Sequence, residues 1–400
     1  MILSKRSVIL ILISVFLINT TGMVIYTYAS TYLLDLGTDR PLMQLIVTIF
    51  PLTAFLFPPI NGFLSDKYQN RKVFLLIGTI GISFAFLMLS LTRDLIFIIL
   101  FLFLFGFFMA SSNISFILYS ELVEDNKKYI SYYNATIVAG WFIGAQFGGI
   151  FIDIYGIENI FLFTFLISLP NLICVVFIRE NRSLILERYK VRVNKNLDGL
   201  NIINTEKESL IPKSIYYGLF FRNFSIKPIM SIIALVMILH LSSESDVGFL
   251  IGINFFLQFF LMLLAGKIIT SKNVKTFMII GYALSAITIF GYIIATNFLI
   301  YFFFQLIFAF SYSMHWAATI VYIAQNTTPK NKGQIMGYAN ASVFSGSFVG
   351  GLFFSLLLGF NPDYYIAMSF MIIFPVISVI VISIKFTPKK LEKKLKRSLI

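Results

Sequence analysis

Long apolar runs, separated by short polar interruptions, make up most of this chain. A helix that crosses a membrane needs about 20 consecutive apolar residues, and twelve runs of this kind can be marked along the sequence. We predict helices over residues 7–30, 42–64, 73–91, 95–119, 131–153, 159–178, 225–242, 247–269, 276–296, 298–324, 334–358 and 364–385. Two pairs are divided only by Thr92-Arg93-Asp94 and by Asn297, but a single helix of about 45 residues would be too long for one crossing. The pattern therefore predicts an all-α integral membrane protein with twelve transmembrane helices.

The positive charges indicate how these helices are oriented. With the N-terminus in the cytoplasm and one crossing per helix, the cytoplasmic segments contain all 31 Lys and Arg residues except Arg40 and Arg93. The acidic residues show no such bias, which agrees with the positive-inside rule, since that rule counts only Lys and Arg. An odd number of helices would spoil the asymmetry. We therefore expect a multi-pass protein of the cell (plasma) membrane with both termini in the cytoplasm.

One long polar interval separates six predicted helices from the next six. The expected organisation is an N-terminal six-helix bundle (1–178), a cytoplasmic linker (179–224), a C-terminal six-helix bundle (225–386) and a basic cytoplasmic tail (387–400). Within the linker, residues 209–222 have the apolar spacing of a helix that lies along the membrane. Basic residues in the linker could attract anionic lipid, or the linker could be only a solvated tether.

Composition narrows the class of protein further. The chain has 400 residues, of which 58% are hydrophobic and 12% charged, and this excludes a soluble domain. The net charge of +13 does not indicate nucleic-acid binding, because the basic residues lie at the ends of apolar runs. Cys174 is the only cysteine, so no disulfide framework exists. The N-terminal apolar run lacks an A-x-A-like cleavage site, and we interpret it as the first span instead of a signal peptide.

Several residues of the first half recur in the second half. The first set is Gly62, Leu64, Asp66 and Lys72, with counterparts Gly266, Ile268, Thr270 and Lys275. The second set is Asn134, Ala135, Gly140 and Gly144, with counterparts Asn340, Ala341, Gly346 and Gly350. Together they indicate two related units of six helices each.

The charged turn at 62–72, between two apolar runs, has the most specific spacing. It reads Gly62-Phe63-Leu64-Ser65-Asp66-Lys67-Tyr68-Gln69-Asn70-Arg71-Lys72. It resembles the signature loop between helices 2 and 3 of the major facilitator superfamily (MFS), except that Gln69 stands where the family usually has Gly. The resemblance implies two pseudo-symmetric six-helix bundles that rock about a site near the middle of the membrane. The loop could instead be only a cationic anchor at the cytoplasmic face.

The resemblance also implies roles for individual residues of this turn. Asp66 would cap the N-terminal end of the eleventh helix near Lys332–Gln334, and Arg71 would pair with Glu121. The expected gating residues are therefore Gly62, Asp66, Lys67, Arg71, Lys72 and Glu121.

Glycines at intervals of four form a smooth face on the fifth and eleventh predicted helices. The run Gly140-Trp141-Phe142-Ile143-Gly144-Ala145-Gln146-Phe147-Gly148-Gly149 resembles the glycine-rich motif of the antiporter branch of the MFS, with Ala145 in place of the expected Pro. Such a face could pack against any neighbouring helix or form a hinge between the bundles. We predict packing between the bundles for Gly140, Gly144, Gly148, Gly346 and Gly350.

In the MFS fold, the first, fourth, seventh and tenth helices would line the central cavity. The candidate cavity residues are Asn19, Tyr26, Asn113, Gln258, Tyr312, His315 and Trp316. His315 could contact substrate or handle a proton, or it could be a neutral hydrogen-bond donor between helices. For Trp316, packing is favoured over stacking on substrate.

The groups that are missing from the sequence also bear on the substrate. No Asp or Glu lies in the middle of any predicted helix. The Arg that drug/proton antiporters of the MFS carry ahead of a Gly in helix 4 is also absent, because residues 100–105 before Gly106 are Leu and Phe. A charged substrate would need a counter-charge in the cavity, and none is evident besides His315. A neutral or amphipathic solute is therefore expected.

We therefore expect a secondary active or facilitative transporter of a small solute, working by alternating access. No nucleotide loop, nucleophile elbow or His/Cys metal spacing occurs, so an enzyme, a metal site and a cofactor are not expected. Expected partners are the substrate, the lipid bilayer and a coupling proton through His315, and a monomer is expected. Two alternatives remain on the same fold: a receptor or scaffold that does not transport, and a lipid flippase.

Overall fold

The computed structural model describes residues 5–68, 70–123, 127–179, 211–327 and 332–387. Twelve helical stretches of this described chain are long and apolar enough to cross a membrane, which confirms the predicted number. The chain divides into two compact units. Unit 1 comprises Met1–Gly37 and Ile49–Glu208, and unit 2 comprises Thr38–Thr48 and Ser209–Ile400.

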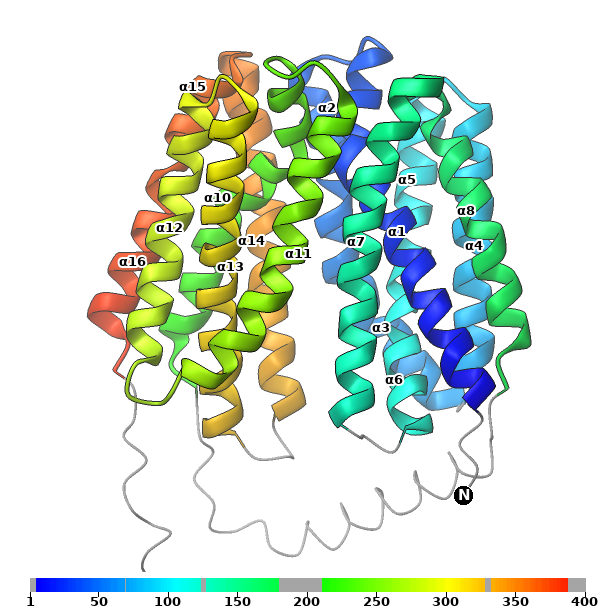
Figure 1. Ribbon diagram of the computed structural model, residues 1–400, viewed down its shortest axis with the longest axis horizontal. Helices are drawn as coiled ribbons and strands as arrows, with labels where there is room; N and C mark the ends of the chain where they lie inside the picture. Colours follow the sequence, from blue (N-terminus) through cyan, green and yellow to red (C-terminus); the bar gives the residue numbers. More distant parts are fainter. Residues whose placement is uncertain (1–4, 69, 124–126, 180–210, 328–331, 388–400) are drawn as a thin grey trace, which may run out of the picture. The chain divides into compact units, whose positions relative to one another are not determined.

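In unit 1, the first helix forms the centre of the packing. Helix α1 lies along both α7 and α8, and α4 packs between α5 and α8 (Figure 1). The helices are α1 (Lys5–Asp35), α3 (Ile49–Tyr68), α4 (Arg71–Leu91), α5 (Leu95–Met109), α6 (Asn113–Leu122), α7 (Lys127–Tyr155) and α8 (Ile160–Phe177), with short 3₁₀ turns at Ala110–Ser112 and Ile157–Asn159.

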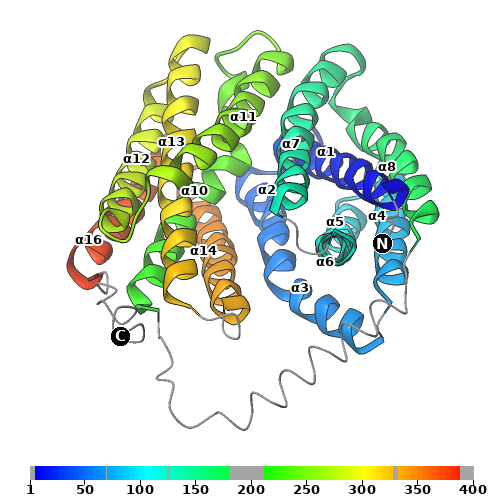
Figure 2. The same cartoon turned by 60° about the horizontal axis from the view of Figure 1, so that its bottom comes forward.

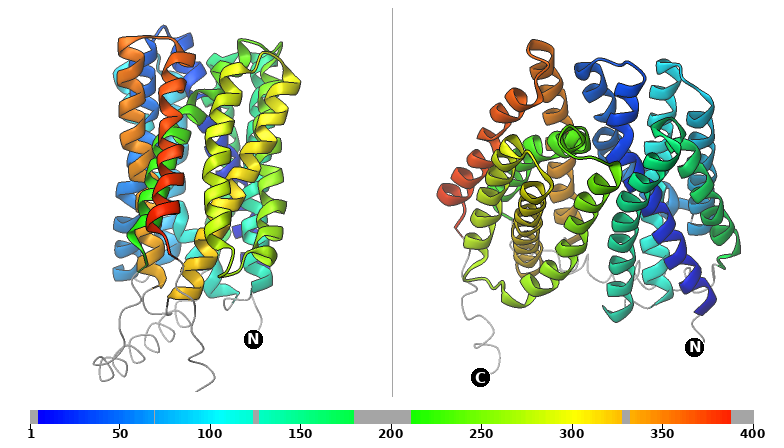
Figure 3. Two further views of the ribbon diagram at one scale, coloured as in Figure 1. Left: turned by 90° about the vertical axis from the view of Figure 1, so that its left-hand side faces the viewer. Right: turned by 45° about the horizontal axis from the view of Figure 1, so that its top comes forward.

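Unit 2 repeats this arrangement around its own first long helix. Helix α10 packs against α14 and α16, and α13 packs against α11 and α12 (Figure 2). The helices are α2 (Arg40–Val47), α10 (Lys213–Ile238), α11 (Glu244–Ile268), α12 (Val274–Ile294), α13 (Phe298–Asn326), α14 (Lys332–Phe360), α15 (Tyr364–Met371) and α16 (Ile373–Lys385). Helices α15 and α16, drawn in red tones in Figure 3, follow each other within one span, Tyr364–Lys385.

Polar residues at the helix starts explain where the spans break. The first N–H groups of a helix have no partner within it, and a side-chain oxygen can accept from them. Asp94 Oδ1 accepts from Ile96 N at 2.8 Å, and Asn297 Oδ1 accepts from Ile300 N at 3.1 Å. The two short interruptions predicted at these places therefore do separate helices.

The predicted second span, 42–64, is divided at Thr48. Its first part, α2, belongs to unit 2, where it packs mainly on α14, while α3 belongs to unit 1. A Cβ placed on Gly351 of α14 would overlap the side chain of Thr48, so the two helices approach closely at this point. The predicted N-terminal bundle 1–178 therefore has to be corrected, because Thr38–Thr48 are built into the other unit.

The predicted boundary between the linker and the second bundle is wrong. Helix α10 begins at Lys213 instead of residue 225, and Ile215, Leu219 and Arg222 are buried in unit 2. Residues 213–222 are therefore part of a span and do not form a helix along the membrane surface. Residues 180–210 of the predicted linker and 388–400 of the basic tail lie outside the described residues.

The glycine faces pack inside each unit. Cβ atoms on Gly140 and Gly144 of α7 would meet the backbone of α1, at Phe16 O and Thr20 O. A Cβ on Gly148 of α7 would lie 2.7 Å from Cε2 of the Tyr28 ring on α1.

The same contact recurs in unit 2 between α14 and α10. Cβ atoms on Gly346 and Gly350 would meet Phe220 O and Phe224 O. The prediction that these five glycines pack between the bundles is therefore corrected: each lies against a helix of its own unit, and all except Gly148 meet the backbone of that helix.

This packing can be tested within α14. A methyl group on Gly350 would overlap Phe224 O, whereas nothing described lies within 4 Å of a Cβ on Gly337. We expect Gly350→Ala to lower the free energy of unfolding by about 1–3 kcal/mol through overpacking. Gly337→Ala should leave it unchanged or raise it by up to about 1 kcal/mol, because alanine is the better helix former. Thermal unfolding in detergent measures both variants, and equal behaviour of the two would contradict the proposed contact.

Candidate functional site

The predicted gating turn is split between two helices. Gly62, Asp66 and Lys67 lie in the last turns of α3, and Arg71 and Lys72 begin α4. Gln69 lies outside the described residues, as does the side chain of Asp66. The capping of the eleventh helix by Asp66 therefore stays a prediction.

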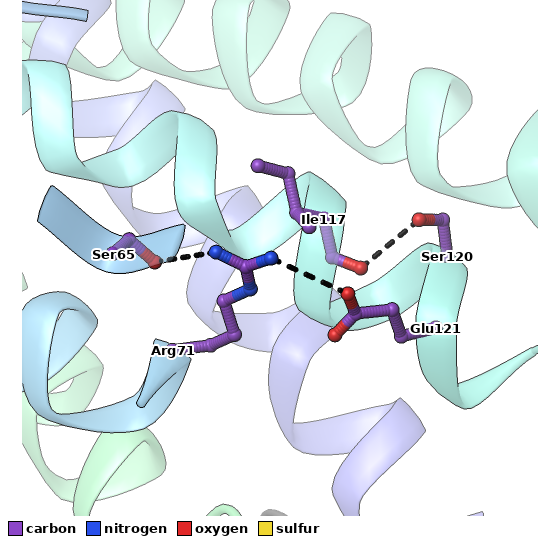
Figure 4. A network of polar contacts seen from close by, with 5 residues as sticks. All are labelled: Ser65, Arg71, Ile117, Ser120 and Glu121. Atoms are coloured by element: carbon purple, nitrogen blue, oxygen red, sulfur yellow. Dashed lines mark hydrogen bonds and ion pairs between the residues drawn. The ribbon is translucent and has the colours of Figure 1, made fainter. Parts of the chain in front are cut away.

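Arg71 forms a buried polar centre at this end of unit 1 (Figure 4). Its Nη1 donates to Ser65 Oγ at 2.8 Å, and its Nη2 lies 3.5 Å from Glu121 Oε1. The two charged side chains are only 8% and 10% exposed. The predicted pairing of Arg71 with Glu121 is therefore present, and it joins α3, α4 and α6.

The other members of the turn have different surroundings. Lys72 Nζ donates to Val176 O of α8 at 2.8 Å. Lys67 is exposed, 5.9 Å from the ring of Tyr68. No described atom lies within 4 Å of a Cβ on Gly62, so this glycine does not mark a close helix contact in the described part of the chain.

The predicted cavity residues of unit 1 lie on α1 and at the start of α6. Asn19 Nδ2 donates to Val15 O of its own helix at 2.7 Å. Tyr26 is half-buried on α1. Asn113 begins α6, and its side chain lies outside the described part of the structure.

In unit 2, Gln258 belongs to a buried amide network. Asn254 Nδ2 donates to Gln305 Oε1 at 2.8 Å and to Gln305 O at 2.9 Å, and Gln258 Nε2 donates to Asn254 Oδ1. All three side chains are buried. The network joins α11 to α13, so hydrogen bonding between these two helices explains why Gln258 is buried there.

His315 is fully buried on α13, with 1% of its surface exposed. Its Nδ1 lies 2.8 Å from Ser311 O, and because a carbonyl only accepts, Nδ1 must donate. The ring lies beside two tyrosines, with centroids 5.2 Å from Tyr282 and 5.5 Å from Tyr312. Trp316 is half-buried and stacks on Tyr312 at 6.4 Å.

Sequence reasoning missed Arg222, the largest of the fully buried side chains. Its Nε donates to Ser285 Oγ of α12 at 3.0 Å, and its Nη1 donates to Asn223 Oδ1 at 3.4 Å. The guanidinium carbon lies 5.8 Å from the ring centroid of Phe308 and 5.6 Å from that of Tyr312, both on α13. Arg222 therefore lies where α10, α12 and α13 meet.

Lys227 is a further cation within α10, at a half-buried position. Arg222 and His315 share Tyr312 as a neighbour, whose ring centroid lies 5.6 Å from the guanidinium carbon and 5.5 Å from the centroid of His315. The expectation that the spans offer no counter-charge besides His315 is therefore wrong. It arose because the predicted helix began at residue 225, which left Arg222 in the linker, and because Lys227 was counted with the cytoplasmic segments. The apolar residues Leu219, Phe220 and Phe221 directly before Arg222 were the signal that could have placed the start of this helix earlier.

Among the described residues, no set of three or more His, Cys, Asp or Glu side chains comes together to hold a metal ion. The buried polar centres of this part of the chain include the Arg71 pair, the amide network and the group of Arg222 and His315 around Tyr312.

Comparisons with known proteins agree with this architecture. A curated MFS-type transporter of Methanocaldococcus jannaschii is 25% identical over 369 residues, covering 87% of this chain and 90% of the relative. Among solved structures, the nucleoside transporter NupG aligns with a TM-score of 0.76 at 10% identity, over 95% of this chain and 100% of its own. The Escherichia coli xylose transporter XylE aligns with a TM-score of 0.71 at 13% identity, over 98% of each chain.

A sequence profile covers nearly the whole chain. The profile of the Major Facilitator Superfamily matches residues 10–207 and 215–399, and so includes both units. The structural likenesses, at this low identity, show the same fold. The chain therefore belongs to the Major Facilitator Superfamily and is a membrane transport protein of that family.

Proposed function

We propose that this chain moves a small solute across the plasma membrane by alternating access, with units 1 and 2 rocking as rigid bodies. The observation that carries the proposal is the buried polar cluster on α10 and α13, which includes Arg222 and His315. Ionisable residues are expensive inside a membrane and usually mark a substrate or ion pathway. The glycine contacts support the rigidity of each unit, since they join α1 to α7 and α10 to α14.

The proposed substrate chemistry changes with the structure. A neutral or amphipathic solute was expected because no counter-charge besides His315 was evident in the expected cavity. Arg222 and Lys227 on α10 remove that reason. Coupling to a proton through His315 remains part of the proposal, and so does the monomeric state.

We further propose that the Arg71–Glu121 pair holds the cytoplasmic end of unit 1 together while the units rock. Ser65, Arg71 and Glu121 come from three helices, and both charges are nearly buried. A buried pair of this kind joins α3, α4 and α6 into one piece. In this proposal the termini and residues 62–72 face the cytoplasm, as the distribution of Lys and Arg indicates.

Transport can be measured in proteoliposomes. Purified protein should equilibrate at least one class of labelled solute faster than protein-free liposomes. The panel would include nucleosides, sugars, amino acids and organic acids. A folded preparation that moves no solute would favour the receptor, and one that scrambles only lipid would favour the flippase.

Orientation can be measured by cysteine labelling in a Cys174→Ser background. We expect Lys67→Cys to react with a membrane-impermeant maleimide only after cells are permeabilised. Arg93→Cys, on the opposite face in this proposal, should react in intact cells. Both positions are exposed on unit 1, so they form a matched pair. Labelling of Lys67→Cys in intact cells would overturn the orientation.

The Arg71 pair makes a prediction about stability. Glu121→Gln removes a counter-charge from the buried Arg71, and we expect the free energy of unfolding to fall by about 3–5 kcal/mol. Lys72→Met, which removes the bond from an exposed ammonium group to Val176 O, should lower it by about 1 kcal/mol. Denaturant unfolding of both variants and of Arg71→Met/Glu121→Met provides the comparison. If Glu121→Gln is as stable as Lys72→Met, the pair does not hold these helices.

A further inference from the structure

Four membrane spans have an end beside one pocket of unit 2. The spans that contain α10 and α14 end at Ile238 and Phe360, and those that contain α2 and α15 begin at Arg40 and Tyr364. The pocket has a volume of about 290 Å³ and lies at the end of unit 2 where Figure 1 labels α15. Small-molecule sites usually measure about 300–1,000 Å³, so this pocket suits a compact ligand. Its lining includes Arg40, Leu239, Asn361, Asp363, Tyr364 and Tyr365.

Arg40 supplies the positive charge of this pocket. Its Nη1 donates to Pro362 O, and its guanidinium carbon lies 4.5 Å from the ring centroid of Tyr364. Stacking on an aromatic face holds a guanidinium in place and leaves its edges available for hydrogen bonds. Among the described residues, Arg40 makes no ion pair, and only one of its five N–H groups is engaged. The remaining donors match the oxygens of a carboxylate or a phosphate.

Asp363 supplies a negative charge to the same pocket. Its Oδ1 caps α15 by accepting from Tyr365 N at 2.7 Å and from Ile366 N at 3.3 Å. Its Oδ2 accepts no hydrogen bond within the described part of the chain. Asp363 and Arg40 line one pocket without forming an ion pair with each other. The pocket therefore offers a cation and a carboxylate that are both available to a ligand.

Other polar groups of the lining have unused hydrogen-bonding capacity. Asn361 Oδ1 accepts from Asp363 N at 3.0 Å, which leaves the Nδ2 group of Asn361 as a donor. The hydroxyl groups of Tyr364 and Tyr365 are buried and have no partner in the part of the chain that is described. Buried hydroxyl groups are normally hydrogen-bonded, so these two agree with a polar ligand. The apolar side of the pocket is Leu239, which is 60% exposed.

We propose that this pocket binds a compact zwitterion. The carboxylate or phosphate of the ligand accepts from Arg40, and its ammonium group donates to Asp363 Oδ2. A ligand with a single charge would be attracted by one of these side chains and repelled by the other. The same chemistry occurs in a free amino acid and in the ethanolamine phosphate headgroup of a phospholipid. Both can reach a pocket at the ends of membrane spans, and the site does not depend on the proposed transport function.

The first test measures ligand stabilisation of the full chain in an uncharged maltoside detergent at neutral pH. The zwitterionic probes are phosphoethanolamine, glycine and β-alanine, and the singly charged comparisons are methyl phosphate, acetate and ethylamine. Binding to the folded state raises the unfolding temperature by mass action. We expect at least one zwitterion to raise the unfolding temperature at concentrations where the singly charged compounds do not.

Two conservative variants remove one charge each. Asp363→Asn retains a good helix cap, and Arg40→Gln retains a donor for Pro362 O. Each should lower the affinity for the zwitterion roughly tenfold or more, as for loss of a hydrogen bond to a charged group. Arg93→Gln and Asp94→Asn are the matched controls, because they alter an exposed arginine and a helix-capping aspartate of unit 1. Both controls should bind as the wild type does.

The second test distinguishes the two sources of the zwitterion. Unfolding is measured in nanodiscs of phosphatidylethanolamine and of phosphatidylglycerol with the same acyl chains. Higher stability in phosphatidylethanolamine that Asp363→Asn loses and Asp94→Asn keeps would identify a lipid headgroup. A response to the free probes alone would identify a soluble ligand.

Three results would overturn the site. One is that no zwitterion, free or as a lipid, stabilises the wild type. Another is that Arg40→Gln and Asp363→Asn bind the zwitterion as tightly as the two controls do. The third is that a singly charged compound binds as tightly as the zwitterion.

Discussion

Polar groups at membrane depth have no water to bind, so each must find a partner within the protein. Many short polar side chains of this chain meet the requirement by bonding to a carbonyl one turn earlier, as Thr20 does with Phe16 O and Thr319 with His315 O, both at 2.8 Å. Others bridge helices, as Ser14 does with Asn171 at 2.6 Å. The side chains that bridge helices therefore act as cross-links, and the apolar residues remain on the surface for the lipid.

Backbone contact at glycine is the second source of rigidity. In lipid, helices gain little from burying apolar side chains against each other, so close packing and polar bonds must hold them. Helix α1 meets α7, and α10 meets α14, through glycines that face carbonyls of the neighbouring helix. Lys72 in the first turn of α4 donates to Val176 O, and Lys275 in the first turn of α12 makes the equivalent bond to Ser383 O, each at 2.8 Å. Each unit can therefore move without deforming, which alternating access requires.

Against this shared framework, the differences between the units carry the functional information. Unit 1 has a buried ion pair between α4 and α6, near the end of the spans. Unit 2 instead places Arg222 deep in its core, held by Ser285 and next to Tyr312, whose ring also neighbours His315. Ionisable groups at membrane depth are costly and usually mark a substrate or ion pathway, so this group supports the proposed transport function.

The amino-acid sequence by itself determined the class of this protein, because apolar length and the placement of Lys and Arg are set residue by residue. Twelve spans and the breaks at Asp94 and Asn297 were predictable from spacing, whereas the pairing of Arg71 with Glu121 was implied by the resemblance to the family. The tertiary structure decided which helices share an interior. Glycine spacing describes a smooth face but not its partner, so the contacts inside each unit could not be told from contacts between bundles. Likewise, the start of α10 depends on burial against α12 and α13, because only there does the charge of Arg222 find Ser285 and the rings that allow it to enter a span.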